Sequence, residues 1–177
     1  YSLSAFGRII VTLLDAPRFI ERDTLLEMTL DNEARIHCTP DHEFLRRDGR
    51  LAQAHELRPN DALMPLYRQL ICGYEAVYQP LNGHLYPTHR LIKERQAGPA
   101  MNKDLGHLDP GNRTWPASGT ASWAWRNHDN YNHHHNHHNH KITAIRALPG
   151  DHDVYCLTVP EAGNFALEAG VFVRNCG

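Results

Sequence analysis

The first third of the chain alternates between short apolar runs and polar turns, which is the pattern of half-buried β-strands. Over residues 8–38 the apolar positions are rich in β-branched types, and the pair Asp31-Asn32 interrupts them. The pattern predicts a β-meander over this stretch. Further along, the pattern predicts a turn at 39–42 fixed by Pro40, a short helical stretch over 52–57 and a buried strand over 62–66.

The pattern changes after residue 66. A short hairpin is predicted within 74–86 and a basic helix over 89–96, and apolar periodicity is then lost from 101 to 140. The last part of this stretch is a run of His and Asn that holds seven of the fourteen histidines. Such a polar segment cannot bury enough apolar surface to order itself without a ligand. We therefore interpret residues 67–140 as an insertion, mostly irregular and polar.

Strand-like patterning returns abruptly at 141–145 and 154–159, with a turn predicted at Pro149-Gly150-Asp151. Two more short strands are predicted, over 164–167 and 171–173. The β-rich ends of the chain, 1–66 and 141–175, are expected to form one body around the insertion. The predicted fold class is all-β.

Composition narrows the classes of protein that the chain can represent. Its 177 residues fit one domain with an insertion, and a net charge of −2 provides no global field that would attract nucleic acid or an anionic membrane. No apolar run approaches the ~20 residues needed to span a bilayer, and no signal-peptide pattern is visible. The four cysteines are widely spaced and form no C-x-x-C pair. We expect a soluble, cytoplasmic protein without a membrane partner.

The run Val171-Phe172-Val173 leads to Arg174, Asn175 and Cys176. An asparagine side-chain amide can attack its own backbone carbonyl and cut the chain, and a cysteine thiol that follows can accept an acyl group. The pair therefore indicates a junction at which the backbone is cleaved and rejoined.

Three segments together resemble the self-splicing inteins of the Hint superfamily. Residues 36–45 contain the T-x-x-H block as Thr39 and His42, 153–167 resemble the penultimate block, and 170–176 resemble the last block. The resemblance implies a flattened all-β horseshoe, with residues 176–177 as the start of the downstream extein. It also implies autocatalytic, single-turnover cleavage and ligation that excises the element and joins the flanking exteins.

Roles follow from this resemblance by position. Cys176 would take the upstream segment as an acyl group, and Asn175 would then cyclise to break the bond between them. His42 would protonate the leaving amide nitrogen of the upstream junction, because the pKa of histidine lies near neutrality, and Thr39 would hydrogen-bond at the same site. Asp41 is assigned as an assisting residue.

Three positions depart from the family pattern. Residues 1–4 offer no junction cysteine and first block, so we expect either a truncated intein or the carboxyl-terminal piece of a split intein that needs a separate amino-terminal fragment. Arg174 stands where the family usually has a histidine and cannot shuttle a proton at pH 7, so cyclisation should be slow or assisted. Gly163 stands where a second helpful histidine often lies, and His152 or an ordered water would substitute.

Cys156 stands where most inteins have an aspartate, and three roles are open to it. In a minority class without the amino-terminal nucleophile, a cysteine at this place attacks the upstream junction directly. The class usually carries a Trp after the T-x-x-H block and a small hydroxyl residue after the final asparagine, and this chain has neither. In the second role the thiol lines or assists the cleft, and in the third it only packs.

The insertion carries a second set of candidates. Gly106 to Arg113 resembles the start of an HNH nuclease in its H-x-D-x-x-N pattern, which offers a general base and metal ligands. An active nuclease, a relic and an unrelated loop all remain open, and nucleic-acid binding is expected only of the first. The candidate ligands for a divalent metal such as Zn²⁺ or Mg²⁺ are His107, Asp109, Asn112, His133, His135 and His137.

The sequence thus supports a splicing element that needs no cofactor for its own chemistry. Two competing functions are a degenerate Hint fold with a metal-binding His-rich module and an HNH-type DNA endonuclease. The spacing of the insertion histidines fixes no single tetrahedral set, so any Zn²⁺, Ni²⁺ or Cu²⁺ affinity there should be weak and spread over several registers.

Overall fold

The structure is a computed structural model, and it describes residues 1–80, 82–97 and 140–175. Its elements in chain order are β1 (Ser2–Leu3), β2 (Ile9–Ile10), β3 (Arg18–Leu30), β4 (Arg35–Cys38), β5 (Glu43–Leu45), β6 (Leu51–Gln53), a 3-10 turn (Ala54–Glu56), β7 (Arg68–Ile71), β8 (Tyr74–Gln79), β9 (His84–Pro87), α1 (Thr88–Ala97), β10 (Ile142–Cys156), β11 (Asn164–Ala166) and β12 (Phe172–Arg174). The predicted all-β class is confirmed. No helix among the described residues is long and apolar enough to cross a membrane.

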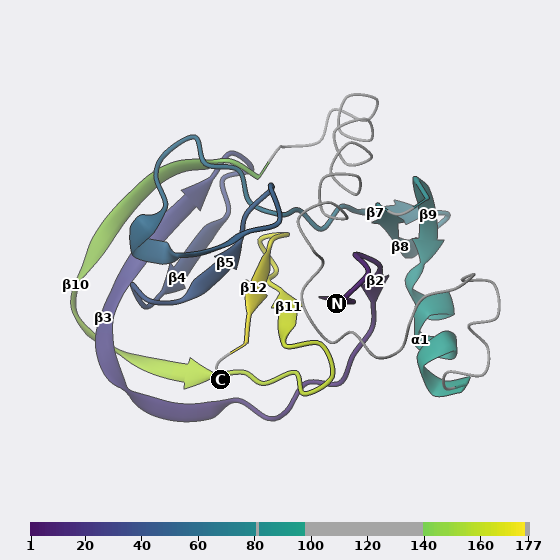
Figure 1. Cartoon of the computed structure of the whole chain (residues 1–177), viewed down its shortest axis with the longest axis horizontal. Coiled ribbons are helices and arrows are strands. Elements are labelled where there is room, and N and C mark those ends of the chain that lie inside the picture. The colour runs from purple at the N-terminus through teal and green to yellow at the C-terminus, as the bar shows by residue number, and fades with distance from the viewer. Residues whose placement is uncertain (81, 98–139, 176–177) are drawn as a thin grey trace.

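Strands β3 and β10 pair along most of their length and form a long curved ribbon at one side of the molecule (Figure 1), with β4 on the other edge of β3. The turn predicted at 149–151 is wrong. β10 continues through these residues, and between the pairs Ala147↔Leu26 and Asp151↔Thr24 it carries two more residues than β3. Gly150 lies here at φ +80°. Residues 148–150 therefore form a β-bulge within β10 instead of a turn, and the bulge bends the ribbon.

Glu27 ties the three strands of this sheet together. It is 6% exposed, and its carboxylate contacts His37 of β4 (Nε2 to Oε2, 3.0 Å) and Arg146 of β10 (Nη2 to Oε1, 2.7 Å). The hydrogen bond from His37 lowers the pKa of Glu27, burial opposes this effect, and Arg146 reinforces it. The carboxylate is a charged cross-link because both neighbouring strands supply its partners.

A second sheet has the order β11-β12-β5-β6, and its middle strand β12 contributes to two apolar cores. Val171 and Val173 pack with Phe44 and Met28 in one cluster, whereas Phe172 packs in the other. Successive side chains of a strand point to opposite faces, so β12 is buried on both sides. Each fully buried side chain of this size contributes about 1.5–3 kcal/mol to stability.

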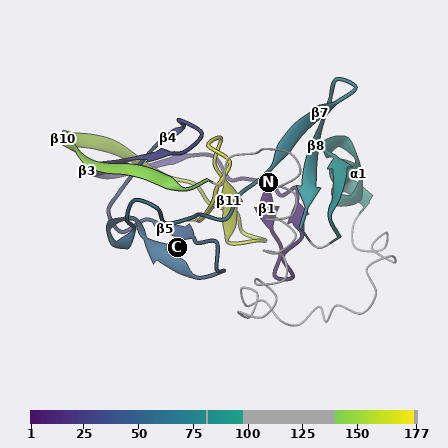
Figure 2. The same ribbon diagram turned by 90° about the horizontal axis from the view of Figure 1, so that it is seen from above.

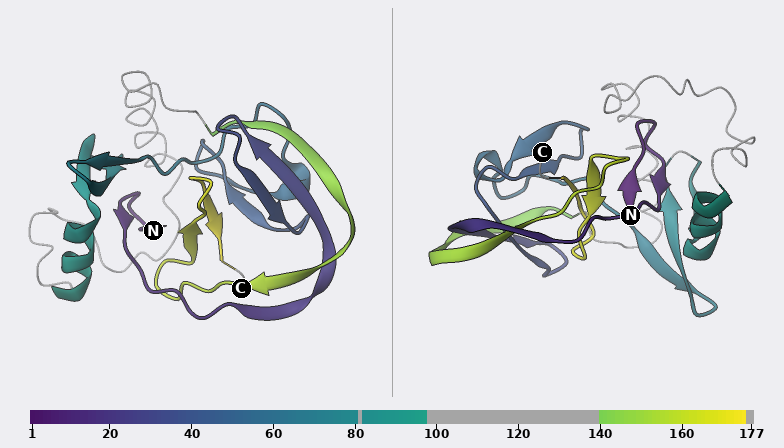
Figure 3. Two further views of the ribbon diagram at one scale, coloured as in Figure 1. Left: turned by 180° about the vertical axis from the view of Figure 1, so that it is seen from behind. Right: turned by 90° about the horizontal axis from the view of Figure 1, so that it is seen from below.

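The expected insertion begins with regular structure. Strands β7, β8 and β9 form an antiparallel sheet followed by α1, in agreement with the predicted hairpin and helix. Figures 2 and 3 show this unit beside β1 and β2, at the opposite end of the molecule from the ribbon. Val77 and Leu91 share the second core with Leu3 and Ile9, and the Gln79 side chain bonds the backbone of Ile9 in both directions (2.9 and 2.6 Å). This part of the insertion thus packs on the amino-terminal strands.

Asn164 anchors strand β1 to the carboxyl-terminal sheet. Its side chain is 1% exposed, accepts a hydrogen bond from the Leu3 amide (2.8 Å), and donates to the carbonyls of Leu3 and Ala162 (both 2.8 Å). Every polar atom of the buried carboxamide is therefore used, and so are both backbone groups of Leu3.

Replacing Asn164 with Ala should lower the free energy of unfolding by about 2–3 kcal/mol, because the buried backbone groups of Leu3 lose their partners. Urea titration of both proteins would measure this loss. Asn82→Ala is the matched control, since Asn82 is exposed and makes only a local bond to the His84 amide. An unchanged unfolding midpoint in Asn164→Ala would contradict the anchoring role.

Candidate functional site

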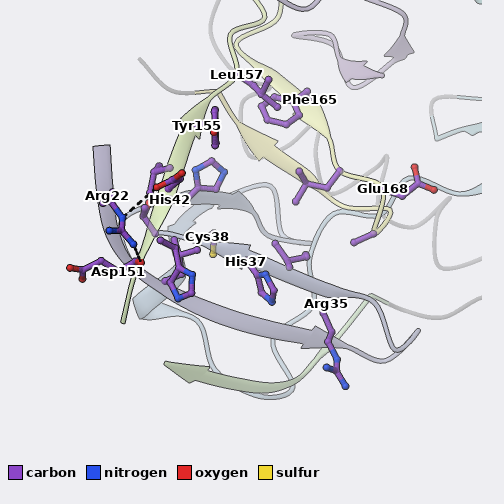
Figure 4. A pocket seen from close by; sticks show the side chains of 18 residues that line it. Arg22, Arg35, His37, Cys38, His42, Asp151, Tyr155, Leu157, Phe165 and Glu168 are labelled. Carbon is purple, nitrogen blue, oxygen red and sulfur yellow. Dashed lines mark hydrogen bonds and ion pairs between the residues drawn. The ribbon is translucent and has the colours of Figure 1, made fainter. Parts of the chain in front are cut away.

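A cavity of about 870 Å³ opens between the ribbon, β4, the 39–42 turn and β11. The predicted site residues Thr39, His42 and His152 all line it, and so do Tyr155 and Phe165. Figure 4 shows Leu157 and Phe165 at one end of this cavity and Arg22 with Asp151 at its side, where the guanidinium donates to the Asp151 carbonyl (2.8 Å). The fold therefore brings the T-x-x-H block to the ribbon end that carries the penultimate block.

The Thr39-to-His42 turn is held by its backbone. The His42 amide donates to the Thr39 carbonyl (3.2 Å), and the His42 carbonyl accepts from the Ala54 amide (2.9 Å). The imidazole packs edge-on against Phe44, with ring centroids 5.5 Å apart. Because the ring is fixed by a core side chain, His42 presents a defined edge to the cavity.

Burial lowers the pKa of His42 below its ordinary value of 6.5, and the charges of Asp41 and Glu43 partly oppose this effect. His42 is therefore neutral at pH 7, and one ring nitrogen can accept a proton while the other donates. Asp41 itself is exposed and is not among the cavity-lining residues, so it reaches the site through its charge.

Cys38 is also in the cavity wall, a position that the sequence did not mark as functional. Burial, with a smaller contribution from the charge of Asp41, raises the pKa of its thiol to about 12. The thiolate is the nucleophilic form of cysteine, so Cys38 is a protonated, unreactive thiol at neutral pH.

Asn175 lies where three strand ends meet. Its backbone amide donates to the Gly163 carbonyl (3.1 Å), and a Cβ added to Gly163 would lie 3.4 Å from Asn175 Oδ1. On the other side β12 pairs with β5 at Val173↔Phe44. Continuing this antiparallel register by two residues puts Asn175 opposite His42. The two residues predicted to act at the two junctions therefore belong to neighbouring strand ends.

Comparison with known proteins decides the family. The model of the intein splicing domain matches residues 9–175, nearly the whole chain. The chain belongs to the intein splicing domain family. It is therefore a protein-splicing element. Inteins are flanked by exteins in a precursor protein, and their splicing is autocatalytic.

Two similar proteins give the extent of the likeness. The B subunit of DNA gyrase from Synechocystis sp. (strain ATCC 27184 / PCC 6803 / Kazusa) is 34% identical over 99 residues, which are 50% of this chain and 9% of that protein. The matched residues of this chain thus cover only a small part of the length of this relative. A DnaB intein from Synechocystis sp. PCC 6803 has a crystal structure that is 13% identical, with a TM-score of 0.51 over 99% of this chain and 77% of that one. This second likeness concerns the fold alone.

Arg174 does not line the cavity of the intein. Its guanidinium is half-exposed and bonds the carboxylate of Glu43 across the strands (Nη1 to Oε2, 2.8 Å). Asn175 is not among the cavity-lining residues either, so of this pair of neighbours Arg174 is the one whose side chain has a described partner on β5. Glu43 is a residue that sequence reasoning missed, because only the cross-strand register reveals its partner.

Cys156 is the last residue of β10 and is 4% exposed. Its neighbours Tyr155 and Leu157 line the cavity but Cys156 does not, and its Sγ lies 3.9 Å from Thr158 Oγ1. The thiol is thus buried outside the set of residues that line the cavity. His152, in contrast, lines the cavity, with Nε2 3.2 Å from the Pro149 carbonyl.

Several predicted residues lie outside the described part of the chain. They are Cys176, the HNH-like residues His107, Asp109 and Asn112, and the insertion histidines His133, His135 and His137. Among the residues that the structure describes, no group of three or more His, Cys, Asp or Glu side chains is placed to hold a metal ion. The metal and nuclease expectations for the insertion therefore stay predictions.

The imidazole of His42 should titrate with a midpoint below 6.5, because the folded environment disfavours its charged form. The ring signal would be followed by NMR between pH 4 and 8 and assigned by its loss in His42→Gln. Since the folded state binds this proton less tightly than the unfolded state, the stability from neutral His42 is complete above about pH 6.5 and falls as the pH drops below it. A midpoint at or above 6.5 would contradict this description of the site.

Two cysteines of the folded intein should differ in their rates of alkylation. At pH 8 iodoacetamide should modify Cys72, which is exposed, much faster than Cys38, whose thiol is buried and protonated. Peptide mapping by mass spectrometry would give both rates, and unfolding in urea should make them similar. Rapid labelling of Cys38 in the native intein would show that the cavity wall is not formed as described.

Proposed function

We propose that this intein cleaves its carboxyl-terminal junction by cyclisation of Asn175 and joins the flanking exteins through Cys176. The observation that supports this proposal best is the hydrogen bond from the Asn175 backbone amide to the Gly163 carbonyl, beside the pairing Val173↔Phe44, whose continuation leads to Asn175 and His42. This bond fixes the backbone of Asn175, and restricting backbone rotation lowers part of the entropic barrier to a reaction between the side chain and carbonyl of one residue.

The proposed cleavage balances without an added reactant. Nδ2 of Asn175 attacks the carbonyl carbon of the same residue, the bond from this carbon to the Cys176 nitrogen breaks, and the proton lost by Nδ2 goes to that nitrogen. The intein leaves with a terminal succinimide, and the downstream extein begins with a free amine. No cofactor enters this step.

Ligation precedes this cleavage in the proposed sequence. A nucleophile at the upstream junction first attacks the acyl carbon there, and His42 protonates the nitrogen that leaves this carbon while Thr39 hydrogen-bonds at the same junction. The thiolate of Cys176 then attacks the resulting thioester or ester, the first nucleophile leaves, and Cys176 carries the upstream extein as a thioester. After Asn175 has cyclised, the free amine of Cys176 attacks its own thioester, and the extein moves from sulfur to nitrogen to form a peptide bond.

Two features predict a slow reaction. Arg174 replaces the histidine of the family pattern and cannot accept a proton at pH 7. Gly163 has no side chain to donate a hydrogen bond, and its φ of +66° disfavours any other residue. The nearest substitute is an ordered water or His152, the histidine that the sequence analysis assigned as an assisting residue.

The upstream step requires a nucleophile that no residue of the cavity wall supplies, since Cys38 is held as a thiol. We propose that an amino-terminal intein segment contributes it, either in the same precursor or as a separate fragment. The burial of Cys156 and its absence from the cavity wall support this route over direct attack by Cys156. A branched species with the upstream extein attached to Cys156, trapped and identified by mass spectrometry, would reverse this assignment.

Asn175→Ala should abolish release of a reporter protein fused after Cys176, because alanine has no amide to cyclise. The time course of release would be followed by gel electrophoresis, and mass spectrometry would identify the succinimide on the released intein. Asn82→Ala should release the reporter at the parental rate. If the parental fusion releases nothing, with or without an added amino-terminal segment, or if Asn175→Ala still releases it, the proposed function is wrong.

A further inference from the structure

The ion pair between Arg174 and Glu43 lies directly behind the site. Arg174 is the last residue of β12 and directly precedes Asn175, and Glu43 is the first residue of β5 and directly follows His42. Their side chains meet at 2.8 Å, with Arg174 51% and Glu43 33% exposed. The pair is therefore placed one residue from each of the two groups that the proposed function requires.

We propose that Arg174 and Glu43 form a clamp that keeps Asn175 opposite His42, so that Arg174 takes part in splicing as a positioning residue through Glu43. This inference rests on the proposed function of Asn175. It assigns Arg174 a role other than proton transfer, which its chemistry forbids.

Strand geometry supports a clamp on the outer face. Val173 and Phe44 are directly paired and both fully buried, so they point to the core. Side chains alternate along each strand, so Arg174 and Glu43 point away from the core, and Asn175 and His42 return to its side. An interaction on one face can thus fix the register of the groups on the other face.

The pairing of β12 with β5 is short, so the ion pair can add to the contacts that hold these two strands together. Val173↔Phe44 is their one residue pair in the described ladder, whereas β12 pairs with β11 at three positions. Beyond Val173 the strand is held to β11 through the backbone of Asn175 and Gly163. On the β5 side the described contact at this level is the ion pair, so its loss should let the strand ends separate.

The clamp also sets the charge next to His42. Glu43 raises the pKa of His42, though by less than burial lowers it, and Arg174 compensates the charge of Glu43. Asp41 is the other acid beside His42 on its own segment. Other groups that line the cavity come from β3, β4, β10 and the turn before β12. The charged or titratable ones are Arg22, Arg35, His37, Cys38, Asp151, His152, Asp153, Tyr155 and Glu168. None of them changes in the variants below.

The first test is the rate of Asn175-dependent reporter release from the full chain. Arg174→Ala and Glu43→Ala should each slow release about two- to fivefold, the range expected for a half-exposed ion pair. Arg174→Lys should retain part of the rate, and the charge swap Arg174→Glu with Glu43→Arg should restore most of what either single change removes. Arg50→Ala is the matched control, because Arg50 is 81% exposed on the same β5–β6 hairpin and should not alter the rate.

The second test follows the His42 ring by NMR in the Asn175→Ala background, and it does not depend on cleavage. Arg174→Ala should raise the midpoint of His42 titration, because Glu43 is left uncompensated, and Glu43→Gln should lower it. A loosened strand end alone would move both midpoints in the same direction, toward the value of exposed histidine. Opposite shifts therefore identify the clamp.

The outcomes separate the two proposals. If the parental chain releases no reporter, the function of Asn175 is wrong, and the His42 titrations still decide whether the pair sets the charge at this site. If the parental chain releases the reporter and Arg174→Ala does so at the same rate, the clamp is wrong and the proposed function stands. Failure of the charge swap to recover any rate also overturns the clamp.

Discussion

The arrangement of this intein depends on strand β12, which is short but buried on both faces. Val171 and Val173 fill the core under the ribbon, and Phe172 fills the core shared with β1, β2 and β8. Because the two cores meet at one strand, neither can be repacked without moving the other. This constraint fixes the strand that leads to Arg174 and Asn175 against Phe44 of β5.

Electrostatics then decides which groups of the site are charged. The cavity wall keeps Cys38 protonated and His42 neutral by burial, whereas the Glu27 carboxylate keeps its charge because His37 and Arg146 both bond it. The same low-dielectric environment thus suppresses one set of charges and retains another, according to whether a partner is present. A neutral histidine beside a buried thiol suits proton transfer at neutral pH, and it leaves nucleophilic attack to residues elsewhere.

Local chemistry was visible in the sequence, but cross-strand geometry was not. The T-x-x-H block and the Asn175-Cys176 pair could be recognised because each is a short motif, and the helix α1 and the hairpin of β8 and β9 followed from periodicity and turn residues. The ribbon was missed as a continuous unit because residues such as Glu21, Arg22 and Asp23 are polar on both faces, so β3 shows no alternation there. Glu43 and the contact of Gly163 with Asn175 were hidden for another reason: pairing partners depend on register, which a single strand does not encode.

The bonds between Asn164 and Leu3 connect residues 161 positions apart in the chain. Contacts of such separation form late in folding, since the entropy of closing a long loop must be overcome before they contribute. During synthesis β1 can pair with β2 early, but its partner Asn164 in β11 becomes available only near the end of the chain. Strand β12, which completes the fold, leads directly to Asn175. Under the proposed function, the residue that cuts the precursor therefore takes its place only when the rest of the fold has been made.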